Sequence, residues 1–274
     1  MQFLLNLHVD DLDGNTLLQG AVWDPNDQHW YLSQSRDAGA IDRQHTRIHR
    51  FSPTGLYQGY VQLDLFGHGS VIGYADGHLW LPCDFYDSQG KTLRVQAARI
   101  DVSRVDFERR TRLTRTSPAL ELFTTGLANN LSPFSPSGDD LFLRWGRQRT
   151  EEYINVALSE FTTQRSPKVL SRISATKAGR AGSFQGCTTA GDWVYVLNGD
   201  TDKINKVTSW SWTDPKPGPV IEVTPAALRR VLTGHVDRPD VVEPEGLSWY
   251  EGELVMGVRT GPGGRSRDFA LVVL

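Results

Sequence analysis

The stretch FQGCTTAGDWVYVLNGD, at residues 184–200, carries a pattern that recurs along the chain. A short strand of small residues leads into a turn with Gly or Asp, and a second strand with alternating large side chains follows. The same pattern is found in LQGAVWDPNDQHWYLSQS (18–35), HGSVIGYADGHLWLPCD (68–84), LSPFSPSGDDLFLRWG (131–146) and PEGLSWYEGELVMGVRT (244–260). The turn dipeptides tolerate positive φ and favour tight hairpins; they are Asn26-Asp27, Asp76-Gly77, Gly138-Asp139, Gly191-Asp192 and Glu251-Gly252. The chain therefore contains five copies of one β-hairpin.

The spacing of these hairpins predicts a β-propeller. Successive turns lie roughly 50 to 60 residues apart, which suits a four-stranded propeller blade better than a helical repeat. Two further strands follow each of the first four hairpins; in the third unit they are YINVALSEF (153–161) and KVLSRIS (168–174). The fifth hairpin is followed only by FALVVL (269–274), and the N-terminal strand QFLLNLHV (2–9) is left over.

We therefore predict an all-β fold with a single domain over residues 1–274. It is a five-bladed β-propeller with four-stranded blades, and its ring is closed by the N-terminal strand pairing in the last blade. Such pairing removes exposed strand edges that would otherwise template aggregation. An eight-stranded barrel or a β-sandwich is the alternative, because neither requires the fivefold register. One helix is expected, at 224–232, where a Thr cap precedes helical spacing.

Composition and charge exclude several classes of function. The net charge is −3 and the cations are not clustered overall, which argues against a general nucleic-acid binder. No stretch is long and apolar enough for membrane insertion. The N-terminus has no basic segment, so we expect no signal peptide, and the protein is either virion-associated or cytoplasmic. The basic run at 104–115 is expected to be a solvated loop or an outer strand, with an anion-binding face as the alternative.

The two cysteines, Cys83 and Cys187, do not indicate a metal site. They lie far apart in the sequence, without a CxxC motif or a neighbouring histidine. Both fall in apolar strand contexts, where a free thiol packs as a small buried hydrophobe. We expect no disulfide, no bound metal and no cofactor.

The geometry of a propeller predicts where a site lies. The first strand of a blade begins, and the second strand ends, at the same face of the ring, around the mouth of the central channel. Polar residues occupy most of these positions, and such groups suit a ligand rich in hydroxyls or charge. The candidate ligand-binding residues are Gln19, His68, Asp84, Arg147, Gln185, Asn198, Glu245 and Arg259. The alternative is that they bond to one another and to ordered water.

Three of these positions repeat one dipeptide motif. Gln19-Gly20, Gln185-Gly186 and Glu245-Gly246 each place a polar residue before glycine at the same register of the hairpin. Glycine permits close approach of backbones at a narrow neck. The repeated motif therefore predicts that these polar side chains lie at equivalent places in three blades.

The segments FGHGSVIGYADGHLWLP (66–82), GSFQGCTTAGDWVYVLNGD (182–200) and EPEGLSWYEGELVMGVRTG (243–261) resemble the repeats of a known propeller family. Phage receptor-binding proteins of Gram-positive hosts and teichoic acid biosynthesis protein C-like proteins share it, and the bacteriocin helveticin J has a similar propeller. The matching motifs are Gly67-His68-Gly69, Gln185-Gly186 with Tyr195-Val196-Leu197, and Glu245-Gly246. The resemblance covers nearly the whole chain. It implies the five-bladed fold and a role in recognising cell-wall glycopolymers.

We accordingly expect a carbohydrate-recognition propeller that binds a Gram-positive cell-wall glycopolymer without catalysis, as an oligomer or attached to a larger assembly. One alternative is a glycoside hydrolase or lyase at the channel mouth, using two carboxyls among Asp84, Asp200, Glu243 and Glu245. No motif of a serine hydrolase, zinc protease or nucleotide-binding site supports other chemistry. The other alternative is an intracellular scaffold of a biosynthetic complex, with the Arg109–Arg115 run as its contact surface.

Overall fold

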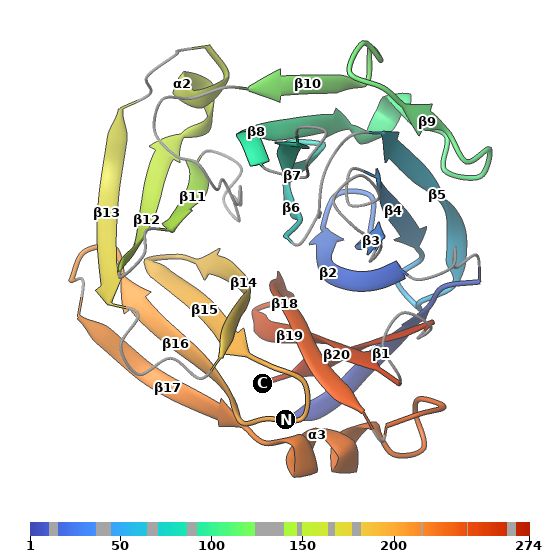
Figure 1. The fold of residues 1–274 in the computed structure, drawn as a ribbon, viewed down its shortest axis with the longest axis vertical. Coiled ribbons are helices and arrows are strands. Elements are labelled where there is room, and N and C mark those ends of the chain that lie inside the picture. Colours follow the sequence, from blue (N-terminus) through green and yellow to red (C-terminus); the bar gives the residue numbers. More distant parts are fainter. Residues whose placement is uncertain are drawn as a thin grey trace.

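The strands form five small sheets that stand around a ring (Figure 1). The structure is a computed structural model. It describes residues 1–10, 16–36, 45–64, 71–86, 92–123, 140–146, 150–163, 168–176, 182–214, 216–239, 241–261 and 267–274. Each sheet is one blade, and we number the blades in chain order. This arrangement is the predicted all-β propeller.

The strands of the blades follow the predicted repeats. Blade 1 contains β2 (Thr16–Asp24), β3 (His29–Arg36), β4 (His45–Phe51) and β5 (Tyr57–Asp64), and β9 (Arg112–Leu113) adds to it. Blade 2 contains β6 (Gly73–Ala75), β7 (His78–Tyr86), β8 (Thr92–Asp101) and β10 (Leu120–Phe123). Blade 3 contains β11 (Asp140–Gly146), β12 (Thr150–Ala157) and β13 (Val169–Thr176). The first strand predicted for blade 3 falls at 131–139, outside the described residues.

Blades 4 and 5 complete the ring. Blade 4 contains β14 (Ser183–Ala190), β15 (Trp193–Gly199), β16 (Asn205–Ser211) and β17 (Pro217–Val223). Blade 5 contains β18 (Val242–Tyr250), β19 (Glu253–Thr260), β20 (Asp268–Val273) and, as its outer strand, β1 (Gln2–His8). β1 runs antiparallel to β20, with Gln2 opposite Val273. The predicted closure by the N-terminal strand is therefore confirmed.

Among the described residues, five hydrophobic clusters hold the ring together, one at each junction between neighbouring blades. Their members alternate along the strands, as they must when both faces of a blade pack against a neighbour. Representative buried pairs are Ile48 with Leu81 for blades 1 and 2, Trp80 with Ile154 for blades 2 and 3, Tyr153 with Val196 for blades 3 and 4, Leu197 with Met256 for blades 4 and 5, and Leu32 with Leu271 for blades 5 and 1. Cys83 and Cys187 are buried members of two of these clusters, as predicted.

The turn chemistry is also confirmed at two of the predicted hairpins. Asp76 and Gly77 have φ of 49° and 72°, and Glu251 and Gly252 have φ of 48° and 89°. Two successive residues with positive φ make a type I′ turn, whose twist matches that of the strands it joins. The turn predicted at Gly138-Asp139 lies outside the described residues.

The helices were predicted in part. α3 (Pro225–Leu232) is the expected helix, and the hydroxyl of Thr224 caps it by accepting a hydrogen bond from Ala227 N at 3.2 Å. The strand predicted over 153–161 is too long: it ends at Ala157, and α2 (Leu158–Thr163) follows. Phe161 explains the change, because the helical turn brings its ring to 6.0 Å from that of Trp80 in the core between blades 2 and 3. No helix among the described residues has the length and apolar character of a membrane span.

The basic run at 104–115 forms loop and outer strand, as expected, but in an unexpected place. After β8 the chain passes through the 3₁₀ helix η1 (Val102–Arg104) and crosses from blade 2 to blade 1 (Figure 1). There β9 pairs in parallel with β5, and Tyr60 N donates to Phe107 O at 3.1 Å. We call residues 102–113 the clasp, because they join two blades through backbone hydrogen bonds.

Replacing Leu7 by Ala should lower the free energy of unfolding by about 2–5 kcal/mol, because this side chain is fully buried between blades 5 and 1. The matched control Leu56→Ala shortens a side chain that is 69% exposed, and its effect should stay below about 0.5 kcal/mol. Urea denaturation followed by circular dichroism measures both variants. Equal effects would show that the junction closed by β1 does not contribute to stability.

Candidate functional site

The three polar-glycine dipeptides form β-bulges at one level of the ring. In blade 1 the regular pairing of β2 with β3 breaks between Leu18 and Ala21, where Gln19-Gly20 lies. The pairing breaks in blade 4 between Phe184 and Gly186, and in blade 5 between Pro244 and Leu247. A bulge leaves a residue without an opposite partner and turns its side chain out of the regular alternation. The equivalent register predicted from the sequence is therefore present as a shared backbone feature.

The glycines of these bulges bring the three inner strands into backbone contact. A Cβ atom added to Gly186 would lie 2.5 Å from the Cα atom of Gly246. A Cβ atom added to Gly246, whose φ is +100°, would lie 3.1 Å from the Cα atom of Gly20. β14 contacts β18, and β18 contacts β2, so these strands meet on one side of the ring axis (Figure 1). We call the polar residues around this contact the axial site.

The ends of the second strands bring further polar residues to the axial site. Gln34 lies opposite Leu18, Asn198 opposite Phe184, and Arg259 opposite Glu243. Side chains from both sets are almost entirely enclosed: the exposed fraction is 3% for Gln19, 1% for Gln34, 3% for Asn198, 5% for Glu245 and 8% for Arg259. Gln185 is half-buried. The polar groups therefore line the interior of the ring and present little open surface.

Arg259 connects the two carboxyls of blade 5. Its guanidinium donates to Glu243, and its Nε atom lies 3.8 Å from Glu245 Oε1. Burial raises the pKa of Glu245 well above its ordinary value, because a carboxylate loses its hydration inside the ring. Glu243 is the nearer partner of Arg259 and therefore carries most of the ion pair. The arrangement pairs one cation with one carboxylate and leaves the second carboxyl inclined to keep its proton.

A histidine that the sequence did not single out fixes the orientation of Gln34. His49 of β4 is fully buried, and burial, assisted by Arg47, lowers its pKa to about 3, so its ring is neutral near pH 7. Because Gln34 Oε1 is only an acceptor, His49 Nε2 donates to it at 2.7 Å, and Nδ1 accepts from the Tyr57 hydroxyl at 3.2 Å. The segment HTRIHRF at 45–51 could have indicated a buried histidine, because His49 lies among the buried positions of this strand.

Hydrogen bonding within the axial site is incomplete for one amide. Gln185 Nε2 donates to the Gly199 carbonyl at 3.2 Å and is held in place. Asn198 Oδ1 is buried and has no hydrogen-bond partner among the described residues. A buried acceptor without a partner costs about 1–3 kcal/mol, and a water molecule or a ligand hydroxyl would remove that cost. Asn198 is thus the described residue best suited to receive a hydroxyl.

The structure brings together five of the eight candidate residues: Gln19, Gln185, Asn198, Glu245 and Arg259. His68 and Arg147 lie outside the described residues, and Asp84 is placed only by its backbone, in β7 opposite Val95. Their part in the site stays a prediction. Among the described residues, no group of three or more His, Cys, Asp or Glu side chains is arranged to hold a metal ion.

Residues 17–267 match the model of the phage 5-bladed beta propeller receptor binding platform domain. The chain belongs to this family. A search of curated proteins gave no match. Membership in the phage receptor-binding platform family agrees with the five blades of the structure and supports a binding role.

Solved structures share the fold of this receptor-binding platform domain at low sequence identity. A glutaminyl cyclase of Myxococcus xanthus is 10% identical with a TM-score of 0.55, and the alignment covers 100% of this chain and 97% of that one. An exo-beta-1,3-galactanase of Phanerochaete chrysosporium with galactose is 8% identical with a TM-score of 0.57, over 96% of this chain and 61% of that one. A Bacteroides ovatus protein, Xyloglucan PUL GH43B, is 11% identical with a TM-score of 0.52, over 98% and 54%. These likenesses show the fold alone.

Gly186→Ala should destabilise the protein by about 3 kcal/mol, because the added methyl group meets the backbone of Gly246, which has no side chain to move aside. The matched control is Gly191→Ala, where the methyl group meets nothing within 4 Å and only the φ of +54° is unfavourable, at about 1 kcal/mol. Chemical denaturation compares the two. A smaller loss for Gly186→Ala than for Gly191→Ala would argue against backbone contact at the axis.

The raised pKa of Glu245 predicts a pH dependence of stability. Because the folded state binds this proton more tightly than the unfolded state, the stabilisation is fully present below the unfolded pKa, near 4.5, and is lost as the pH rises through the folded pKa. Glu245→Gln removes the titration, so the variant should gain stability relative to the native protein as the pH rises above about 4.5.

The matched control for this titration is Glu253→Gln, which replaces an exposed carboxylate at the start of the next strand. Its difference in unfolding free energy from the native protein should stay nearly constant over the same pH range. Urea denaturation at several pH values measures both differences. A difference between Glu245→Gln and the native protein that does not change with pH would contradict the effect of burial on Glu245.

Proposed function

We propose that this receptor-binding propeller recognises a cell-wall glycopolymer of a Gram-positive host, with the axial site as the place of recognition. The match of residues 17–267 to the phage receptor-binding platform family carries the proposal, since it assigns a binding role to nearly the whole chain. The resemblance of its motifs to phage receptor-binding and teichoic acid-related proteins supplies the class of ligand.

The chemistry of the axial site supports a ligand rich in hydroxyls. Amide and carboxyl groups from three blades converge there, and each can exchange hydrogen bonds with a sugar hydroxyl. Asn198 Oδ1 has an unused acceptor position among the described contacts. Gln34 and Arg259 are held by His49 and Glu243, so the site loses little side-chain freedom when a ligand binds.

The narrow enclosure of these residues favours recognition of one sugar unit or chain end. The exposed fractions of a few per cent argue against a long polymer lying along these residues. The affinity of one site would accordingly be modest, and attachment of several propellers to a larger assembly would raise the avidity. Such an assembly agrees with a role on a virion.

Binding of the fluorescently labelled protein to a panel of Gram-positive cells, and to their purified wall glycopolymers, tests the function. We expect saturable binding to some strains that disappears when the wall polymer is removed. Absence of binding to any wall material by the folded protein would contradict the glycopolymer as ligand. Release of reducing ends from the same polymers would instead favour the alternative of a glycoside hydrolase.

Two variants test the place of recognition. Gln185→Ala and Asn198→Ala should each weaken binding about tenfold, the effect of losing one well-formed hydrogen bond to the ligand. The matched control Gln2→Ala removes an exposed amide from the outer strand of blade 5 and should bind as the native protein does. Circular dichroism shows whether each variant is folded. Unchanged binding by both axial variants would move the recognition site elsewhere on the propeller.

A further inference from the structure

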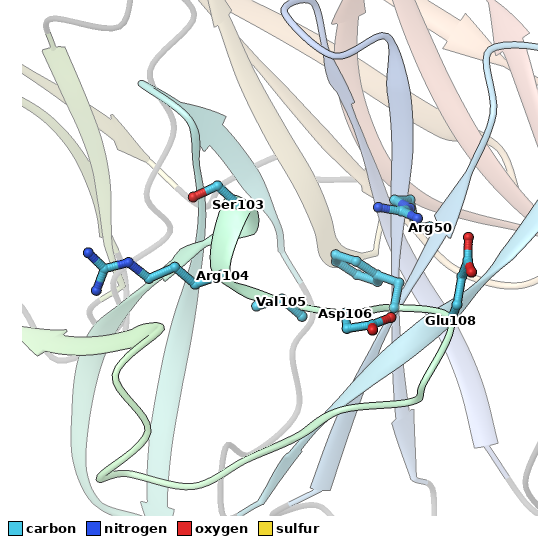
Figure 2. A pocket seen from close by; sticks show the side chains of 7 residues that line it. Arg50, Ser103, Arg104, Val105, Asp106 and Glu108 are labelled. Carbon is cyan, nitrogen blue, oxygen red and sulfur yellow. The ribbon is translucent and has the colours of Figure 1, made fainter.

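A hollow of about 490 Å³ lies where the clasp crosses from blade 2 to blade 1. Figure 2 shows its wall: Arg50 comes from β4, and Ser103, Arg104, Val105, Asp106, Phe107 and Glu108 come from the clasp. The hollow is far from the axial site along the strands. Arg50 lies opposite Tyr31, close to the turn at 25–28, whereas Gln34 lies at the other end of β3.

Arg50 is the unusual group in this wall. Its guanidinium stacks on the ring of Phe107, with the Cζ atom 4.8 Å from the ring centre. Among the described residues it forms no ion pair, and its buried Nε atom has no hydrogen-bond acceptor. A guanidinium carries five N–H donors, and a buried donor without an acceptor is costly. The charge of Arg50 is therefore available to a ligand.

A second stacked arginine of the same molecule has a carboxylate partner, although its Nε atom, like that of Arg50, is buried without an acceptor among the described residues. Arg99 of β8 stacks on Trp80 and Phe123, with centroid distances of 5.6 and 5.3 Å. It also forms an ion pair with Glu121 at 2.5 Å. Both arginines stack on an aromatic ring, but Arg99 also has a carboxylate partner and Arg50 has none among the described residues. Arg50 lacks an anion that its counterpart has.

The other charged side chains of the hollow do not form an ion pair with Arg50. Arg104 pairs with Asp101 at 3.1 Å, and its side chain extends away from Arg50 in Figure 2. Asp106 is engaged within the clasp, where its carboxylate accepts from Arg109 N at 3.0 Å and pairs with Arg109 Nε at 3.4 Å. Glu108 is exposed and stands near Arg50 in Figure 2, and no ion pair joins the two.

We propose that the hollow is a second binding site, which takes an oxyanion, as a phosphate or a carboxylate group, at Arg50. Two oxygens of such a group match the planar fork of the guanidinium, whose face is held by Phe107. The carboxylate of Glu108 at the rim would repel a second anionic group of the ligand. It therefore favours a ligand that carries a hydroxyl or an ammonium group beside the oxyanion. This site is separate from the axial site and does not depend on what the axial site binds.

Titration of the full chain with inorganic phosphate and with acetate, at constant ionic strength, tests the proposal and distinguishes the two oxyanions. Backbone amide NMR signals of residues 103–108 should shift and saturate with at least one of them, and glycerol should leave them unchanged. The signals of the axial site should stay constant. Absence of a saturable shift with both anions would overturn the proposal.

Three variants assign the binding to Arg50. Arg50→Gln should weaken binding of the anion about tenfold or more, as the loss of a charge-assisted hydrogen-bond pair predicts. Arg115→Gln, which removes an exposed cation that follows the clasp and lies outside the hollow, should change binding less than about twofold. Glu108→Gln should tighten binding of inorganic phosphate, because an exposed carboxylate near the anion is removed. Equal binding by Arg50→Gln and Arg115→Gln, or no effect of Glu108→Gln, would overturn the assignment.

Discussion

The contact between glycine backbones at Gly186, Gly246 and Gly20 is the constraint on which the axial site depends. Any side chain at Gly186 would occupy space that the Gly246 backbone already fills, so the inner strands of blades 4 and 5 approach as closely as backbones can. The bulges form at this level and turn the preceding polar residues out of the regular alternation. The close approach of the backbones, the bulges and the convergence of the polar side chains therefore all depend on one local sequence, a polar residue followed by glycine.

The polar groups gathered in this way would destabilise the ring if they lacked partners. The structure supplies most of them from the same blades: His49 for Gln34, Gly199 for Gln185, and Glu243 for Arg259. These contacts also fix the direction of each side chain, which in the proposed function would lower the entropic cost of recognition. The amide oxygen of Asn198 has no such partner among the described residues.

The sequence predicted what depends on local pattern. Strand alternation, turn dipeptides and the repeated Gln-Gly and Glu-Gly dipeptides are each encoded within a few residues, so the blades, the N-terminal closure and the equivalent register of the dipeptides followed from them. The clasp did not, because β9 is only two residues long and its partner strand lies in another blade. α2 was missed since Phe161 gains its place through a tertiary contact with Trp80. The contacts of His49 with Gln34 and of Arg50 with Phe107 likewise depend on tertiary packing, which no local sequence pattern indicates.

The pairing of β1 with β20 also governs how the ring can assemble. Asn6 bonds to Asp268 across 262 positions of the sequence, so β1 is paired with a strand that is synthesised much later. Most strands of blades 1 to 4 pair with neighbours that are close in sequence, but β1 must wait with an open edge until β20 is made. Contacts of such long range slow folding, and an unpaired edge in the meantime invites association with other chains. Completion of the ring by its outer strand is thus a step at which the growing chain is open to misassembly.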